Sequence, residues 1–218
     1  MQAPALYKVL IYASIFSAII PLFSGIIKFK TLSFELKVLF IYIIICVVTE
    51  IFSLITSKSN VDLFHAIQNT FTLVECQLLL YIMFVGINSK LIRTFIILAS
   101  ILFLFVNAVV YFFIANILTT NNITATFESC LLIFVAFLFF YNATSEVIEL
   151  KLKENSFFWI SAAILLYFTT AFSIFLYSKQ LANKDAPGGF IFFLSLQRII
   201  NIAYNSMLAI ALWKTKRV

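Results

Sequence analysis

Seven apolar runs, separated by short polar links, make up most of this 218-residue sequence. Each run is about 18 to 26 residues long, the length that a helix needs to cross a hydrocarbon core about 30 Å thick. Backbone groups inside a bilayer must be hydrogen-bonded within the chain, so runs of this kind are expected to form α-helices. We therefore predict an all-α integral membrane protein, with residues 1–218 forming one bundle of seven transmembrane helices. The predicted spans are residues 5–27, 36–56, 63–86, 94–118, 124–144, 157–178 and 190–213.

The composition favours the same class of protein. The sequence is 63% hydrophobic and 11% charged, whereas soluble domains are about half apolar and a quarter charged. Its formal charge is +6, but the basic residues lie in short links, where they set topology and meet anionic lipid. No basic surface with aromatic or groove-reading residues is evident, so we expect the lipid bilayer as a partner and no nucleic acid.

The distribution of Lys and Arg predicts an orientation. Ten of these residues fall on the side that holds the first, third and fifth links and the C-terminus, and four fall on the other side. The positive-inside rule then places the C-terminus in the cytoplasm and the N-terminus outside. The first run lacks the features of a cleaved signal peptide. With a composition rich in Ile, Phe, Lys and Asn, the sequence indicates a multi-pass protein of a bacterial inner (plasma) membrane.

The third run carries a polar stripe. His65, Gln68, Asn69, Thr72 and Glu75 follow helical spacing, which places them on one face of the predicted helix. Exposing that face to lipid would be costly, so we expect it to point into protein or water. The remaining helices are expected to surround it.

Further polar residues lie at similar predicted depths in the second, fifth and seventh runs. The topology places the ionisable ones in the outer half of the membrane. Arg198 needs a carboxylate or water, because a guanidinium group does not give up its proton. Depth favours Glu75 as its partner, with Glu128 next. The predicted ligand-binding residues are Arg198, Glu75, Glu128, Glu50, Asn69, Gln197, Asn201 and His65.

These residues suggest a binding or sensing module. A small polar or anionic ligand would enter from the outer side, meet Arg198 and displace its counter-ion. A membrane or cytoplasmic signalling partner would be reached through the inner loops, with residues 146–154 and the basic tail as candidates. The outline resembles that of small bacterial seven-helix membrane modules, some of which act as sensor inputs, but no motif accompanies this resemblance and no family is assigned.

Three other functions remain open at this stage. The glutamates could act as the relay of a small-solute or proton-coupled transporter. Glu75 or Glu128 could serve as the general acid or base of a membrane-embedded lipid-modifying enzyme, although the sequence leans away from catalysis. The chain could also be a structural subunit, in which an Arg–Glu pair only fixes helix register and amide side chains only join helices.

The sequence gives no indication of a cofactor or a metal site. It has one histidine and no pair of nearby cysteines, so ligands for a metal are too few. Rhodopsins hold retinal on a lysine of the seventh helix, where this chain has Arg198 and no lysine before Lys214. Seven-helix zinc hydrolases use several histidines, and rhomboid-type proteases need a G-x-S-x motif that is missing here. No catalytic residue is therefore assigned.

Overall fold

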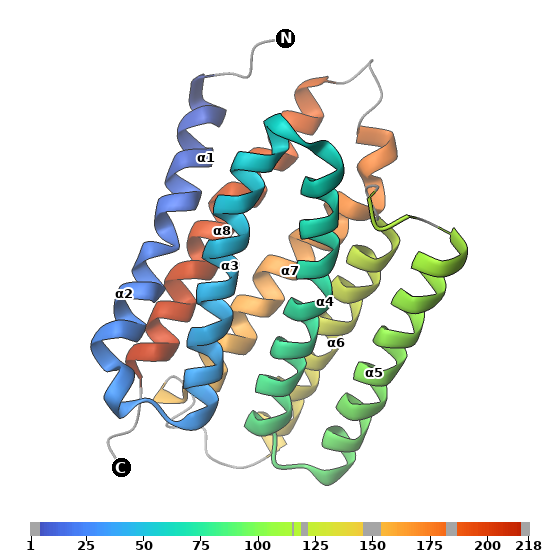
Figure 1. Ribbon diagram of the computed structural model, residues 1–218. Helices are drawn as coiled ribbons and strands as arrows, with labels where there is room; N and C mark the ends of the chain where they lie inside the picture. The colour runs from blue at the N-terminus through green and yellow to red at the C-terminus, as the bar shows by residue number, and fades with distance from the viewer. Residues whose placement is uncertain (1–4, 115, 119–121, 146–153, 182–186, 215–218) are drawn as a thin grey trace.

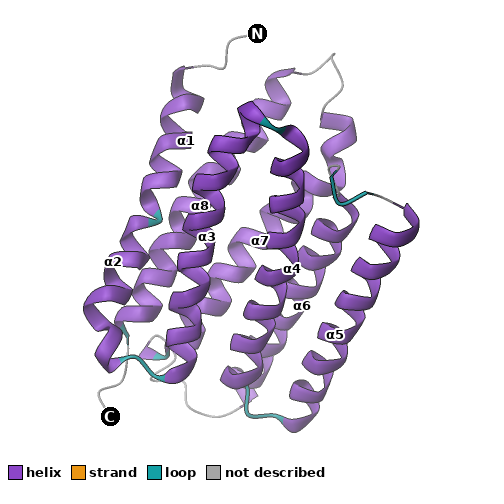
Figure 2. Cartoon of the chain, viewed as in Figure 1, coloured by secondary structure: helices purple, strands orange, loops and turns teal. Residues whose placement is uncertain are grey.

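The structure, a computed structural model, describes residues 5–114, 116–118, 122–145, 154–181 and 187–214. Within these residues the chain is helical, with no strands, and its helices form one bundle (Figures 1 and 2). The elements are α1 (Ala5–Ser17), α2 (Ile19–Lys28), the 3₁₀ turn η1 (Phe29–Thr31), α3 (Phe34–Ser59), α4 (Val61–Gly86), α5 (Lys90–Val109), the π-helical turn η2 (Val110–Ile114), α6 (Asn122–Ser145), α7 (Ser156–Leu181) and α8 (Pro187–Trp213).

Six helical lengths of the described chain are long and apolar enough to cross a membrane. They are α1 with α2, then α3, α4, α5 with η2, α6 and α7. Large apolar side chains lie exposed on the outside of the bundle, among them Leu91, Phe112 and Phe113 at 80–84% exposure. Water would disfavour such a surface and lipid would cover it. The all-α fold is thus confirmed and the six lengths are compatible with an α-helical membrane protein, whereas the seventh crossing, by α8, and the orientation stay predictions.

The first predicted span is broken where the sequence contains a proline. Pro21 has no N–H to donate to the carbonyl of Ser17, and its ring crowds that carbonyl. The helix accordingly ends at Ser17 and restarts at Ile19, leaving Ala18 at the break. The fourth span also differs from the prediction of 94–118, because α5 passes into the π-helical turn and helical structure ends at Ile114.

A single residue, Asn60, separates α3 from α4. Its side-chain oxygen accepts a hydrogen bond from the Leu63 N–H at 3.0 Å, which caps the first turn of α4. As a result α3 continues to Ser59, three residues beyond the prediction. The two helices pack against each other along an antiparallel hairpin (Figure 1).

The other helices complete the bundle around this hairpin. In the structure α6 packs on α4 and α7, and α8 packs on α7, α1 and α2. The α5 helix lies at the edge against α4 and α6 (Figure 1). The start of α1 and the end of α8 lie at opposite ends of the bundle (Figure 1). A chain that passes along the bundle an odd number of times has its ends arranged in this way.

Apolar packing is concentrated in one half of the bundle. In α3, α4 and α8 the buried apolar residues come from segments 36–43, 76–83 and 204–212. The first and third segments are near the end that carries Lys28, Lys37 and Lys214, and the second leads to the same end at Gly86. The other half of these helices buries Ser53, Thr56, Asn69 and Glu75 instead. The bundle is therefore sealed at one end and polar towards the other.

Gly25 allows α2 to approach α3 closely. A Cβ atom at this position would overlap the ring of Phe40, which is buried in the sealed half. Small residues of this kind let neighbouring helices pack in membranes, where van der Waals contact is a main source of association.

We predict that Gly25→Ala lowers the stability of the bundle, because the added methyl displaces the Phe40 ring. Overpacking of this kind costs about 1–3 kcal/mol, which outweighs the gain of about 1 kcal/mol in helix propensity. Unfolding by a denaturing detergent, followed by circular dichroism, measures the change. Gly25→Ala with Phe40→Leu should lose less than the two single changes together. Ala13→Leu, at an exposed position of α1, is the control; an equal loss there would show that packing at Gly25 is not the cause.

Candidate functional site

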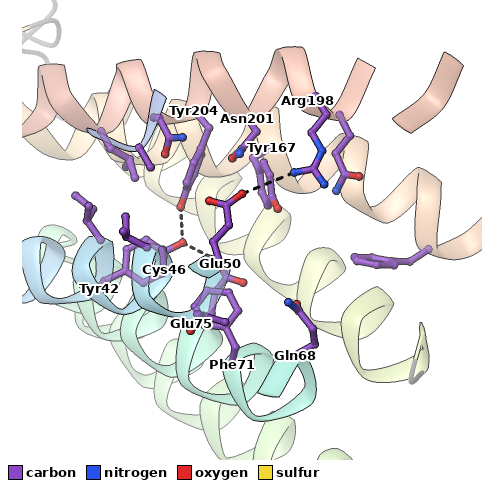
Figure 3. A pocket seen from close by; sticks show the side chains of 18 residues that line it. Tyr42, Cys46, Glu50, Gln68, Phe71, Glu75, Tyr167, Arg198, Asn201 and Tyr204 are labelled. Atoms are coloured by element: carbon purple, nitrogen blue, oxygen red, sulfur yellow. Dashed lines mark hydrogen bonds and ion pairs between the residues drawn. The ribbon is translucent and has the colours of Figure 1, made fainter. Parts of the chain in front are cut away.

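A cavity of about 280 Å³ lies in the polar half of the bundle, next to the point where the apolar packing ends. It is bordered by α3, α4, α7 and α8, and Ala18 at the break between α1 and α2 also lines it. Figure 3 shows the polar side chains that point into this space from α3, α4 and α8. The cavity therefore lies between four helices, and the break between α1 and α2 also borders it.

The more exposed side of the cavity carries an ion pair. Arg198 Nη1 of α8 lies 3.8 Å from Glu50 Oε1 of α3, and the two side chains point towards each other (Figure 3). They are 35% and 27% exposed. The separation exceeds hydrogen-bond distance, and a half-solvated pair of this kind contributes little to stability. The pair is thus loosely held, and both groups remain accessible.

The buried floor of the cavity is a chain of hydrogen bonds across three helices. The Tyr42 hydroxyl donates to Glu75 Oε1 at 2.6 Å, and it lies 2.8 Å from the Tyr204 hydroxyl. Because the single Tyr42 proton is given to Glu75, Tyr204 must be the donor to Tyr42. All three side chains are buried. The chain joins α8, α3 and α4 and separates the cavity from the packed apolar half.

Two amide side chains attach α8 to the first helical length. Asn201 Nδ2 donates to Ser14 Oγ and Asn205 Nδ2 donates to Ser17 Oγ, each at 2.8 Å. The spacing of four residues on α8 and three on α1 places both pairs on facing sides of the two helices. The small serines allow this close approach. Arg198, one turn before Asn201, is thereby held over the cavity.

Aromatic rings form part of the wall. Tyr167 of α7 packs against Tyr204, with ring centroids 4.9 Å apart and an interplanar angle of 35°. Phe71 of α4 and Phe175 of α7 also line the cavity. On α4, Gln68 lies one turn from Phe71 and donates to Ser53 Oγ of α3 at 2.7 Å. The site thus combines one cation, two carboxyl groups, neutral amides and an apolar surface.

The prediction that Arg198 pairs with Glu75, or next with Glu128, was wrong. Its ion-pair partner in the structure is Glu50. The prediction assigned Glu50 to the outer third of its helix and Arg198 to the middle, although the predicted ends at residues 56 and 190 already placed the two within two residues of the same depth. With the observed ends, Glu50 lies nine residues before the end of α3, and Arg198 lies eleven residues after the start of α8. Glu75 is fourteen residues into α4, where it bonds Tyr42 instead.

Five of the eight predicted ligand-binding residues line the cavity: Glu50, Glu75, Gln197, Arg198 and Asn201.

The other three predicted residues do not. Asn69 donates to the carbonyl of Ile117 at 2.7 Å, and His65 is half-buried with its ring edge-on to Phe64. Glu128 is buried on α6, and its Oε1 has no hydrogen-bond partner within the described chain. The polar stripe on α4 therefore divides, because residues 68 and 69 differ by about 100° around a helix. Gln68 and Glu75 face the cavity, whereas Asn69 faces the segment after η2.

Four aromatic residues of the site were missed in the sequence: Tyr204, Tyr167, Phe71 and Phe175. Tyr204 had a usable signal, since it lies three residues after Asn201 and so shares the polar face of α8. Tyr42 also had a usable signal, since it lies four residues before Cys46 and eight before Glu50 and so shares their helical face. Tyr167 and Phe71 lie among other apolar residues, and no local pattern distinguishes them.

No family model matches the sequence, and no curated protein or solved structure matches it either. Within the described residues, no three His, Cys, Asp or Glu side chains lie close enough to hold a metal ion. The cavity and the side chains around it are therefore the basis for a functional proposal.

We predict that Tyr42→Phe destabilises the protein more than Tyr204→Phe. Loss of the Tyr42 hydroxyl leaves the buried carboxyl of Glu75 without its donor, which costs about 1–3 kcal/mol, whereas loss of one neutral hydrogen bond costs about 0.5–1.5 kcal/mol. The free energy of unfolding in detergent measures both. Tyr81→Phe, at an exposed position of α4, is the matched control and should have no effect. Equal losses at positions 42 and 204 would contradict the hydrogen-bond order described above.

Proposed function

We propose that this chain is a membrane-embedded binding and sensing module whose cavity takes a small polar ligand with an anionic group. The observation that carries the proposal is Arg198, a partly exposed cation held loosely by Glu50 beside a cavity with a closed floor. A buried charge in a membrane protein is costly and is usually retained for function.

Arg198 is suited to be the anion contact. Its guanidinium group is always charged and presents several donors in a planar fork that fits a carboxylate or phosphate. In the resting state Glu50 is its counter-ion at 3.8 Å. Since the two groups are not in direct hydrogen-bond contact, a ligand can take the place of Glu50 beside Arg198 at little cost.

The closed floor favours binding over passage. Beyond Tyr42, Glu75 and Tyr204 lies the packed apolar half of the bundle, with Leu39 and Leu79 fully buried. A ligand that separates Arg198 from Glu50 acts on α8 and α3, and both helices extend to the opposite end. The positive-inside rule places that end in the cytoplasm of a bacterial cell, so we propose that a signalling partner reads it there.

The basic end offers contacts for such a partner. Lys28 of α2 lies over the Trp213 ring of α8, with Nζ 4.5 Å from the ring centroid, and Lys214 is exposed. Most of the mixed-charge link predicted as a partner surface, and the last four residues of the basic tail, lie outside the described residues.

A transporter is the second candidate, and one observation favours it. Ala18, where the first helical length is interrupted, lines the cavity, and interrupted helices beside the substrate site are frequent in secondary transporters. Transport would require the Tyr42–Glu75 floor to open. Solute flux into proteoliposomes that is lost in Glu75→Gln would support transport, whereas binding without flux would support sensing.

The two remaining alternatives have less support. Glu128, one of the two carboxyl groups considered for catalysis, does not line the cavity. A purely structural Arg–Glu pair would be dry and sealed, whereas about a third of the Arg198 side chain is exposed.

Chemical labelling of Cys46, which lines the cavity, tests access by a small anion. The protein would carry Cys76→Ala and Cys130→Ala, so that only Cys46 can react. Intact bacterial cells would then be treated with two membrane-impermeant methanethiosulfonates, the anionic sulfonatoethyl and the cationic trimethylammonioethyl reagent. We predict that Cys46 reacts from outside with both reagents. Arg198→Gln should lower the anion-to-cation rate ratio about five- to tenfold, since the lost charge is worth on the order of 1 kcal/mol.

Lys28→Gln is the matched control, because it removes one positive charge at the opposite end of the bundle. It should leave the ratio unchanged, and the amount of protein in the membrane fraction verifies insertion of each variant. No labelling from outside, or a ratio that does not respond to Arg198→Gln, would contradict the proposed outward-facing anion site.

A further inference from the structure

Arg198 and Glu50 present opposite charges 3.8 Å apart to the same cavity. From this pair we infer that the ligand is a zwitterion with the charge spacing of an α-amino acid, its carboxylate on Arg198 and its ammonium on Glu50. This inference rests on the proposed function, and it names the chemical class of the ligand.

The pair disfavours ligands with a single charge. A simple anion that approaches Arg198 also meets the carboxylate of Glu50, which repels it, and a simple cation at Glu50 meets the guanidinium of Arg198. Like charges brought together at a binding site oppose association. A zwitterion gives each protein charge an opposite partner, so that neither is left unpaired in a partly desolvated site.

The spacing of the two charges fits one arrangement in particular. Standard bond lengths set the nitrogen and the carboxylate oxygens of an α-amino acid roughly 3 Å apart. Laid beside a guanidinium nitrogen and a carboxylate oxygen that are 3.8 Å apart, such a molecule forms a compact array of four alternating charges. A zwitterion with its charges separated by a longer chain cannot lie on both groups in this way.

The rest of the cavity indicates an apolar side chain. Phe71, Tyr167 and Phe175 line the wall, and Val47 lies one turn before Glu50. The other carboxyl group of the cavity, Glu75, accepts from Tyr42 through Oε1 at the floor. A volume of about 280 Å³ corresponds to about nine water molecules, enough for an amino acid of medium size.

Ligand-induced shifts of the thermal unfolding midpoint test the inference on the purified full chain in detergent. Four probes form a matched set. L-Leucine carries both charges, 4-methylpentanoate is the same skeleton without the ammonium, 3-methylbutylamine is the skeleton without the carboxylate, and 6-aminohexanoate is an isomer of leucine with its charges far apart. We expect L-leucine to bind at least about tenfold more tightly than each of the others, because each of them forgoes one charge-assisted contact.

Variants of the two charged residues assign the contacts. Glu50→Gln should remove the preference for L-leucine over 4-methylpentanoate while retaining the response to 4-methylpentanoate, which also shows that the variant is folded. Arg198→Gln should lose the response to both. The comparison of the four probes on the unmodified chain does not depend on the stability of any variant.

The outcomes separate this inference from the function on which it rests. If 4-methylpentanoate binds as tightly as L-leucine, the anion site stands and the zwitterion is refuted. Equal binding of 6-aminohexanoate would refute the α-amino acid spacing. If no probe binds while the anionic reagent still reaches Cys46, the ligand class is wrong and the proposed function survives. If Cys46 is also inaccessible, both fail.

Discussion

The cost of placing a polar group in lipid governs the arrangement of this protein. A backbone N–H or a charged side chain that faces hydrocarbon loses several kcal/mol of hydration with nothing in return. The backbone meets this constraint by forming helices along nearly all of the described chain. Several ionisable side chains of the long helices turn inward, where Arg198 finds Glu50 and Glu75 finds Tyr42. Sheltering them together leaves a polar half of the bundle, and the cavity lies in that half.

The two acidic groups of the cavity differ in their surroundings. Glu75 is buried and accepts a short hydrogen bond from a hydroxyl that is itself bonded to Tyr204. Glu50 is partly exposed and faces Arg198 across a gap that no hydrogen bond spans. A network in which each member has its partners holds a core rigid, whereas a loose ion pair can exchange partners. The same residue type therefore serves as a fixed floor in one place and as a replaceable counter-ion in another.

Much of the fold follows from the sequence, because length and hydropathy specify membrane helices strongly. The predicted spans agree with the described helices apart from their ends and the break at Ala18, and five of eight predicted ligand-binding residues meet at one cavity. The pairing of Arg198 was mistaken because depth was judged by thirds of a span, which separated Glu50 from Arg198 although they lie nine and eleven residues from neighbouring helix ends. Glu128 was assigned to the site from depth alone, and depth does not give the direction of a side chain around its helix. Asn69 was assigned from the polar stripe of α4, which is wide enough to face two different neighbours. Tyr167 and Phe71 required the packing of distant helices, which no local pattern contains.

The one-residue turn at Asn60 has a mechanical consequence. Because only one residue joins α3 to α4, the two helices form a tightly connected hairpin, and this hairpin carries Tyr42, Glu50 and Glu75. The facing wall, with Arg198 and Tyr204, belongs to α8, which is fastened to α1 and α2 and packed on α7. The acidic and basic sides of the cavity thus belong to two groups of helices, which meet where α2 packs on α3 and where Tyr204 lies against Tyr42. A molecule seated between Arg198 and Glu50 would therefore act on the spacing of the two groups on the side of the cavity away from these contacts.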